Sequence, residues 1–199
     1  MNKIALLFLL WLPHAYCDSV SDTLQAKLNA MRTMSATFNQ TVKANKRQVS
    51  HSSGTMALNR PGRFRWQTIR PMAQLVIADG HRLWIYDADL EQVSVKKQDN
   101  GLGGTAALFL SGYNDTVTRD FVVTVNQLGS VFDLRAKSTK ANFQRVTLRF
   151  DGNILNGIGL YDQLGQHTDV HLSNIKVNPK LAPSLFQFKP PKGVDVVLQ

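Results

Sequence analysis

The apolar residues near the start of the chain follow a helical period. They recur at steps of four, four and three residues: Val20, Leu24, Leu28 and Met31. This spacing places them on one face of a helix. Ser19 and Asp22 stand three residues apart, as in a variant of the capping box that begins helices. The pattern therefore predicts an amphipathic helix over Ser19–Met31 whose apolar face packs against a sheet.

From residue 35 the apolar period becomes two, which is the period of a β-strand. Ala36, Phe38, Gln40 and Val42 alternate with more polar residues and form the first run. Ten further short runs follow, at residues 55–59, 63–69, 73–78, 82–87, 91–97, 119–125, 130–136, 143–150, 153–162 and 167–177. Asp79-Gly80 and Asp151-Gly152 are strong hairpin signals. The basic, polar stretch Lys43–Gly54 is expected to contain the turn of the first hairpin.

About eleven strands are therefore expected, and no helices of the length that parallel strands require lie between consecutive runs. This order predicts a mainly β (α+β) fold with one large antiparallel sheet, curled or partly closed so that its edges are protected. "TAALFL" (Thr105–Leu110) is a short apolar helix candidate after a glycine-rich entry. The proline-punctuated tail Leu181–Val197 is expected to pack on the outside.

The first residues predict a secretory signal peptide. Lys3 supplies a positive charge, Ile4–Leu12 is an apolar run too short to span a bilayer, and Ala15 and Cys17 fit a cleavage site. We expect residues 1–17 to be the signal peptide and 18–199 to form a single domain. An acylated Cys17 is the alternative, but the bulky Tyr16 before it counts against a lipoprotein signal. Cys17 is the only cysteine, so the mature chain would have no disulfide.

The formal net charge of +9 becomes +8 without Lys3. A basic surface suits nucleic acid, anionic lipid or an acidic partner, and charge that only keeps the protein soluble is an equal alternative. Export argues against nucleic acid. Geometry also argues against it, because Phe64 and Trp66 point to the opposite side of a strand from Arg63 and Arg65.

The sequence motifs do not favour an enzyme. No serine lies in a Gly-x-Ser-x-Gly elbow, and no cysteine is available to a mature catalytic site. His167 and His171 share a strand face, but about 13 Å of extended chain separates them, too far for one metal ion. We therefore expect no catalytic residues, no metal and no cofactor.

One apolar sheet face remains as the candidate site. Its candidate residues are Phe64, Trp66, Leu75, Ile77, Leu83, Ile85, Phe121 and Val123. Periodicity leaves two alternatives open: a core filled by the short helices, or a half-open cavity for an apolar ligand under helices that can move. Trp84 and Tyr86 have the opposite parity from Leu83 and Ile85, and alternation does not say which pair faces inward.

The segment from Arg60 to Asp87 contains Arg60-Pro61, Phe64-Arg65-Trp66, Pro71 and "LVIADGHRLWIYD". Together these motifs resemble the LolA family of periplasmic outer-membrane lipoprotein carriers of the Lol system. "FQFKPPKGVDV" (Phe186–Val196) is similar to the family's end of chain, and the first helix followed by "SATFNQ" is similar to its start. The likeness covers essentially the whole mature chain.

The resemblance implies an incomplete, strongly curved antiparallel barrel of about eleven strands with short helices covering its open side. It implies a periplasmic chaperone, acting as a monomer, that shields the acyl chains of lipoproteins. Its partners would be acylated lipoproteins, an inner-membrane ABC transporter and an outer-membrane lipoprotein receptor. A periplasmic binding protein for free fatty acid or glycolipid is the alternative.

The resemblance also implies roles for individual residues. Arg60 would be a latch at the barrel rim that donates hydrogen bonds to backbone of the "TAALFL" segment. The cavity and its rim would be formed by Phe64, Trp66, Leu75, Ile77, Leu83, Trp84, Leu108 and Leu110. The basic run Lys43, Lys46 and Arg47 departs from the family and leaves the docking partners open.

Overall fold

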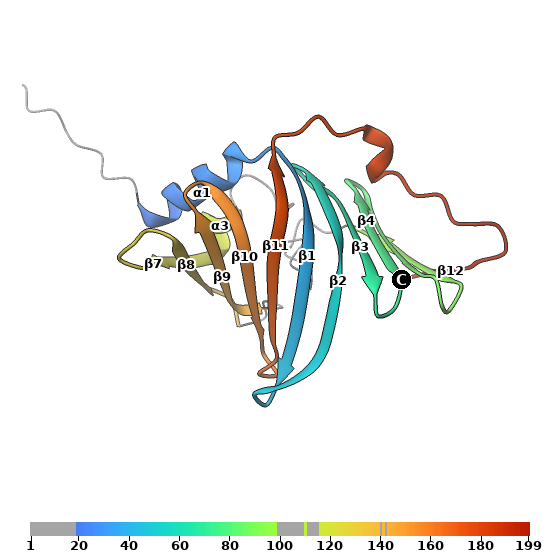
Figure 1. Cartoon of the computed structure of the whole chain (residues 1–199), viewed down its shortest axis with the longest axis horizontal. Coiled ribbons are helices and arrows are strands. Elements are labelled where there is room, and N and C mark those ends of the chain that lie inside the picture. Colours follow the sequence, from blue (N-terminus) through green and yellow to red (C-terminus); the bar gives the residue numbers. More distant parts are fainter. Residues whose placement is uncertain (1–18, 99–109, 111–115, 140, 142) are drawn as a thin grey trace, which may run out of the picture.

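The computed structural model contains one strongly curved twelve-stranded sheet, with α1 (Val20–Ala30) and α3 (Thr116–Asp120) packed on one face (Figure 1). The structure describes residues 19–98, 110, 116–139, 141 and 143–199. The strands are β1 (Thr33–Ala44), β2 (Arg47–Asn59), β3 (Arg63–Arg70), β4 (Gln74–Asp79), β5 (Arg82–Asp87), β6 (Gln92–Lys97), β7 (Phe121–Val125), β8 (Val131–Ala136), β9 (Phe143–Asp151), β10 (Ile154–Asp162), β11 (His167–Val177) and β12 (Asp195–Leu198). Their order in the sheet is β12-β6-β5-β4-β3-β2-β1-β11-β10-β9-β8-β7.

The predicted antiparallel architecture is confirmed, with one strand more than expected. Every neighbouring pair is antiparallel except β12, which runs parallel to β6. β12 has four residues, all exposed, so no alternation marked it in the sequence. It belongs to the tail that was expected on the outside.

The first helix, α1 (Val20–Ala30), begins where the sequence predicts. The Oγ of Ser19 accepts a hydrogen bond from the Asp22 backbone N–H at 3.2 Å, which caps the helix. Leu24 and Leu28 are buried in the main core. Among the elements that the structure describes, α3 (Thr116–Asp120) and the 3₁₀ helix η1 (Pro183–Phe186) are shorter. None of the described helices has the length and apolar content needed to cross a bilayer.

The turn of the first hairpin is short and lies within the polar stretch that was expected to contain it. Asn45 and Lys46 form it, both with positive φ (51° and 63°), and β2 begins at Arg47. Most of the polar stretch predicted around the turn is therefore strand, because β1 offers ladder partners as far as Ala44, which pairs with Arg47. Backbone pairing sustains these strands where no core covers them.

The two faces of the sheet differ. We call the face that carries the main core, including Phe38, Phe64 and Leu148, the inner face, and the opposite one the outer face. On β4–β6 the outer face is apolar and is covered by the C-terminal tail. Phe186 of η1 is 1% exposed, and the Phe188 ring lies 5.6 Å from that of Trp84.

Candidate functional site: the apolar inner face and its rim

The inner face of β1–β5 forms a continuous apolar wall. Phe38 of β1 and Trp66 of β3 stack, with ring centroids 3.9 Å apart and ring planes at 23°. The other buried members of this wall are Met34, Ala36, Met56, Leu58, Phe64, Val76, Ala78 and Leu83. Apolar surface placed against a wall of this composition would be removed from water, which is favourable.

Strand register decides which predicted cavity residues belong to this wall. Phe64 pairs with Ala78, which in turn pairs with Leu83, so these three side chains share the inner face. Trp66 lies on the same face, because it pairs with Val76 of the main core. Phe64, Trp66 and Leu83 therefore lie together on the inner face.

Three residues that the resemblance placed in the cavity or at its rim, Leu75, Ile77 and Trp84, lie on the outer face of the sheet. Ile77 pairs with Arg65 on one side and Trp84 on the other, so it points to the outer face. Leu75 pairs with Tyr86, whose ring lies 5.9 Å from that of Phe188. The C-terminal tail packs against these apolar side chains. Together they form a second hydrophobic layer on the outer face, behind the inner wall.

The "TAALFL" segment lies outside the described residues except for its last member. Leu110 is fully buried within the main core, on the same side of the sheet as Phe64. Leu108 falls among the residues that the structure does not describe. Sequence reasoning missed Phe38, although its place in the alternating run 36–42 already marked it as a core candidate.

Helices α1 and α3 cover the inner face near β7 and are tied to each other. Leu24, Leu28 and Val117 are all buried in the main core. The Gln25 Oε1 accepts a hydrogen bond from the Val117 backbone N–H at 3.1 Å. Gln25 is one of the few buried polar side chains in the described part of the chain, and this bond satisfies its carbonyl oxygen.

Arg60 lies at the rim, directly after β2, and contacts the end of α1. Its Nη1 donates to the Leu28 carbonyl oxygen at 3.1 Å, and its backbone N–H donates to the Arg32 carbonyl oxygen at 2.9 Å. A cation suits this position because the carbonyls of the last helical turn carry partial negative charge. Burial lowers the pKa of Arg60 to about 10, so the guanidinium remains charged at neutral pH.

Gln98 joins two turns at the same rim. Its Nε2 donates to the Gly62 carbonyl oxygen at 2.7 Å, and its Oε1 accepts from the Gly80 backbone N–H at 3.2 Å. Its own backbone N–H donates to the His81 carbonyl oxygen at 2.8 Å. Nothing in the sequence marks Gln98, because its role arises from turns that are far apart along the chain.

The chain matches the profile of the family "Outer membrane lipoprotein carrier protein LolA" over residues 29–189. It is 61% identical over 202 aligned positions to the outer-membrane lipoprotein carrier protein of Legionella pneumophila strain Corby, covering 100% of both chains. It is 39% identical to a protein of the same name from Dechloromonas aromatica, covering 88% of this chain and 86% of that one.

Solved structures share the fold at low identity. A LolA superfamily protein from Nitrosomonas europaea superposes with a TM-score of 0.50 at 11% identity, covering 86% of this chain and 99% of that one. An uncharacterized conserved protein from Thermus thermophilus gives a TM-score of 0.54 at 13% identity, covering 89% of this chain and 99% of that one. These likenesses show the fold alone.

Proposed function

We propose, from the premise that this chain belongs to the LolA family of outer-membrane lipoprotein carrier proteins, that it shields lipoprotein acyl chains against the inner face of its sheet. The chain is a carrier that takes lipoproteins to the outer membrane, and it is not an enzyme. We place its work in the periplasm, where such cargo crosses water between two membranes.

The observation that carries this proposal is the apolar inner wall of β1–β5, including the Phe38–Trp66 stack. An acyl chain of about 15 methylenes costs about 12 kcal/mol to expose to water, at about 0.8 kcal/mol for each methylene. Crossing unaided is therefore too slow to be useful. Burial against aliphatic and aromatic side chains removes most of that cost.

The inner wall is itself buried, so cargo must displace what covers it. Phe38 and Phe64 are fully buried and Trp66 is 9% exposed. The contacts broken when acyl chains enter are recovered when they leave, which keeps the net affinity low enough for release. Because cargo entry breaks these contacts and cargo release re-forms them, the carrier can shield the acyl chains and still pass them on.

We assign Arg60 the role of a latch on α1. Its charged hydrogen bond to the Leu28 carbonyl oxygen joins the last turn of the helix to the end of β2. Hydrogen bonds to charged groups contribute about 1.5–3 kcal/mol. Arg60 thereby favours the covered state of the wall over the open state.

The partners that fit this cycle are an inner-membrane ABC transporter, which loads acylated lipoproteins, and an outer-membrane lipoprotein receptor, which takes them. Loading works against the affinity of a membrane for acyl chains and needs an energy source. Unloading requires a receptor that binds the chains more tightly than the carrier does.

Transfer of a lipoprotein from loaded carrier to receptor-bearing liposomes tests the proposal. Arg60→Leu should slow transfer about tenfold or more, because the closed state loses at least one charge-assisted hydrogen bond. Arg32→Leu is the matched control, since Arg32 is an exposed arginine beside the same rim. Equal transfer by the native chain and Arg60→Leu would remove Arg60 from the mechanism.

A binding protein for free fatty acid or glycolipid would use the same wall without lipoprotein partners. Native mass spectrometry of the protein purified from periplasm separates the two functions. The carrier proposal expects acylated polypeptide in complex with the protein. Free fatty acid or glycolipid alone would favour the alternative.

A further inference from the structure

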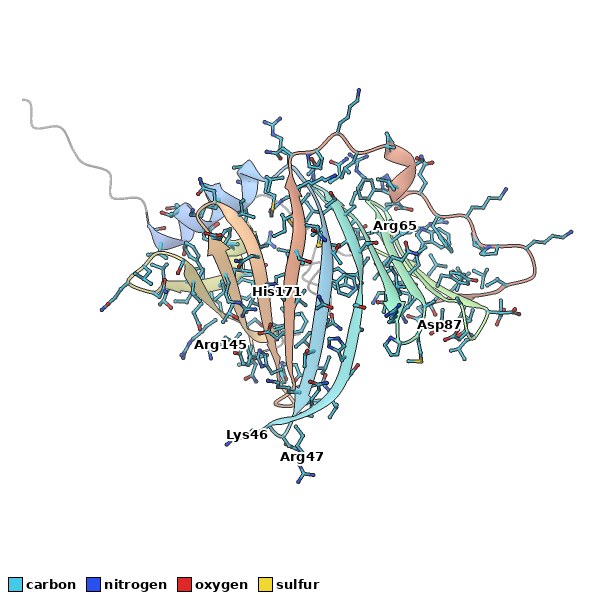
Figure 2. All side chains as sticks on the ribbon, viewed as in Figure 1. Lys46, Arg47, Arg65, Asp87, Arg145 and His171 are labelled. Carbon is cyan, nitrogen blue, oxygen red and sulfur yellow. The ribbon has the colours of Figure 1, made fainter. Side chains whose placement is uncertain are left out.

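The hairpin of β1 and β2 extends beyond its neighbours in the sheet and carries a concentration of positive charge. Arg70, the last residue of β3, pairs with Ser53, so residues 47–52 of β2 extend past the end of β3. On the other side β11 begins at His167, which pairs with Lys43, so the turn extends past β11 as well. Figure 2 shows Lys46 and Arg47 pointing away from the sheet at this end.

The charged residues of this region of the sequence are all basic. No Asp or Glu occurs between Asp22 and Asp79, and the hairpin end itself contains Lys43, Lys46 and Arg47, all exposed. Lys46 occupies a turn position with φ of 63°, where glycine would be the easier residue. The chain thus places a cation at the outermost point of the hairpin despite an unfavourable backbone conformation.

An exposed leucine lies in the turn next to these cations. β11 pairs with both β1 and β10, which brings the β10–β11 turn beside the β1–β2 turn. Leu164 in that turn is 93% exposed. The nearby Asp162 carboxylate is occupied within its own turn, accepting from the backbone N–H groups of Leu164 and Gln166.

We propose that this basic tip, formed by Lys43, Lys46, Arg47 and Leu164, docks the carrier transiently on an anionic phospholipid surface. Basic residues near such a surface each strengthen binding by roughly fivefold, from about 1 kcal/mol apiece. Three of them favour an anionic over a neutral bilayer by roughly 100-fold. Leu164 adds an apolar side chain that enters the interface between head groups.

A fluid lipid surface fits the tip better than an acidic protein does. A stable protein interface needs roughly 800 Å² per partner and a packed apolar centre. The basic tip is a narrow projection with one apolar side chain among separated cations. Mobile head groups adapt to such a shape, whereas a folded partner would have to supply a matching hollow.

Another turn of the molecule supplies an internal comparison. Leu90, between β5 and β6, is 70% exposed, but its neighbours are Asp87, Asp89 and Glu91. Leu90 and Leu164 are thus two exposed leucines in strand turns with opposite surrounding charge. If charge directs docking, only Leu164 should reach the lipid.

Co-sedimentation of the unloaded mature carrier with vesicles tests the charge requirement. We expect binding to phosphatidylglycerol vesicles, little binding to phosphatidylcholine vesicles, and loss of binding as salt rises. The double variant Lys46→Glu, Arg47→Glu should weaken binding at least about 25-fold. Lys189→Glu, Lys192→Glu in the tail changes the net charge equally and should bind much more like the native chain. An equal loss in both variants, or no binding by the native chain, would overturn the proposal.

Tryptophan quenching tests the orientation. With brominated phosphatidylglycerol, Leu164→Trp should lose fluorescence on binding, and Leu90→Trp should show only the change seen in the native chain. Equal quenching at both positions would refute docking through the tip. Charge reversal in the basic tip could leave vesicle binding unchanged and still slow lipoprotein transfer to receptor-bearing membranes. In that case the tip binds an acidic protein and the lipid proposal is wrong. Because both assays use empty carrier and lipid alone, their failure leaves lipoprotein carrying unaffected.

Discussion

The Phe38 ring packs against Gly54, the residue that separates it from its stacking partner Trp66. Phe38 belongs to β1 and Trp66 to β3, and Gly54 belongs to the intervening strand β2. The absence of a side chain at Gly54 leaves room for an aromatic pair that spans three strands. The inner wall is continuous at this point for that reason.

Gly54→Ala is therefore expected to destabilise the fold strongly. A Cβ at this position would lie 1.9 Å from the Gln67 carbonyl oxygen and 2.9 Å from the Phe38 ring. We expect a loss of about 3 kcal/mol in the free energy of unfolding, measured with urea. Gly129→Ala is the control. An added Cβ at Gly129 would meet no atom within 4 Å. This variant should lose only about 1 kcal/mol in the free energy of unfolding, because alanine is strained in the left-handed backbone conformation of Gly129.

Trp66 and Trp84 should report different environments when cargo binds. Trp66 belongs to the inner wall, whereas Trp84 contacts Phe188 of the tail on the outer face. In Trp84→Phe, where Trp66 remains, a lipoprotein with brominated acyl chains should quench most of the fluorescence. In Trp66→Phe, quenching of Trp84 should be weak. Strong quenching of Trp84 would show that acyl chains lie behind the sheet.

Strand parity explains why sequence reasoning located the wall but mixed its two faces. The strands, the first helix and Asp79-Gly80 were all readable, because each depends on local periodicity or turn chemistry. In β4, however, Leu75, Val76, Ile77 and Ala78 are all apolar, so alternation gives no direction. The parity of β4 relative to β3 depends on the number of residues in their connection, which no local pattern fixes.

Arg60 should influence stability in a pH-dependent way only at alkaline pH. Burial lowers its pKa from the ordinary arginine value to about 10, so the folded and unfolded states are equally protonated at neutral pH. The stability difference between the native chain and Arg60→Leu should thus stay constant from about pH 6 to about pH 9. Above about pH 10 the folded state releases the proton first, and the native chain should gain relative stability. Urea titrations of both proteins at several pH values measure this difference.

His167 should reduce stability as pH falls. Burial lowers its pKa, the cations of Lys43, Arg149 and Arg145 lower it further, and Asp169 only partly opposes them. Below about pH 6.5 the unfolded state therefore takes up a proton before the folded state does, and stability declines. His167→Phe keeps a ring stacked on Tyr161, whose centroid lies 4.2 Å from that of His167, and removes the titration. Its urea stability should fall less between about pH 7.5 and about pH 5.5. An identical fall in both proteins would exclude this role.

Lys46→Gly is expected to stabilise the first hairpin. Asn45 and Lys46 both have positive φ, and glycine adopts this conformation without steric cost. We expect a gain of about 0.5–1 kcal/mol in the free energy of unfolding. Lys46→Ala keeps the strain and should give no such gain. Thermal or urea unfolding of the two variants distinguishes relief of strain from simple loss of charge.

The sequence could not predict the hydrogen bond between Arg60 and α1, for a different reason. The family motif drew attention to Arg60, but its described contact is the Leu28 carbonyl oxygen, 32 residues earlier in the chain. A backbone oxygen has no sequence signature, and any residue at position 28 would provide one. Only the packing of α1 across the sheet brings the two atoms together.

The tail behind β4 and β5 gives the two halves of the sheet unequal stiffness. These two strands carry apolar side chains on both faces, so bowing them outward would separate Phe188 from Trp84 and η1 from β4. The outer side of β8–β11 bears Arg145, Arg149, Asp169 and other polar groups that already touch water. When bound acyl chains push the inner faces apart, β8–β11 should bend first, because water lies behind them. β4 and β5, which the tail supports, should keep their curvature.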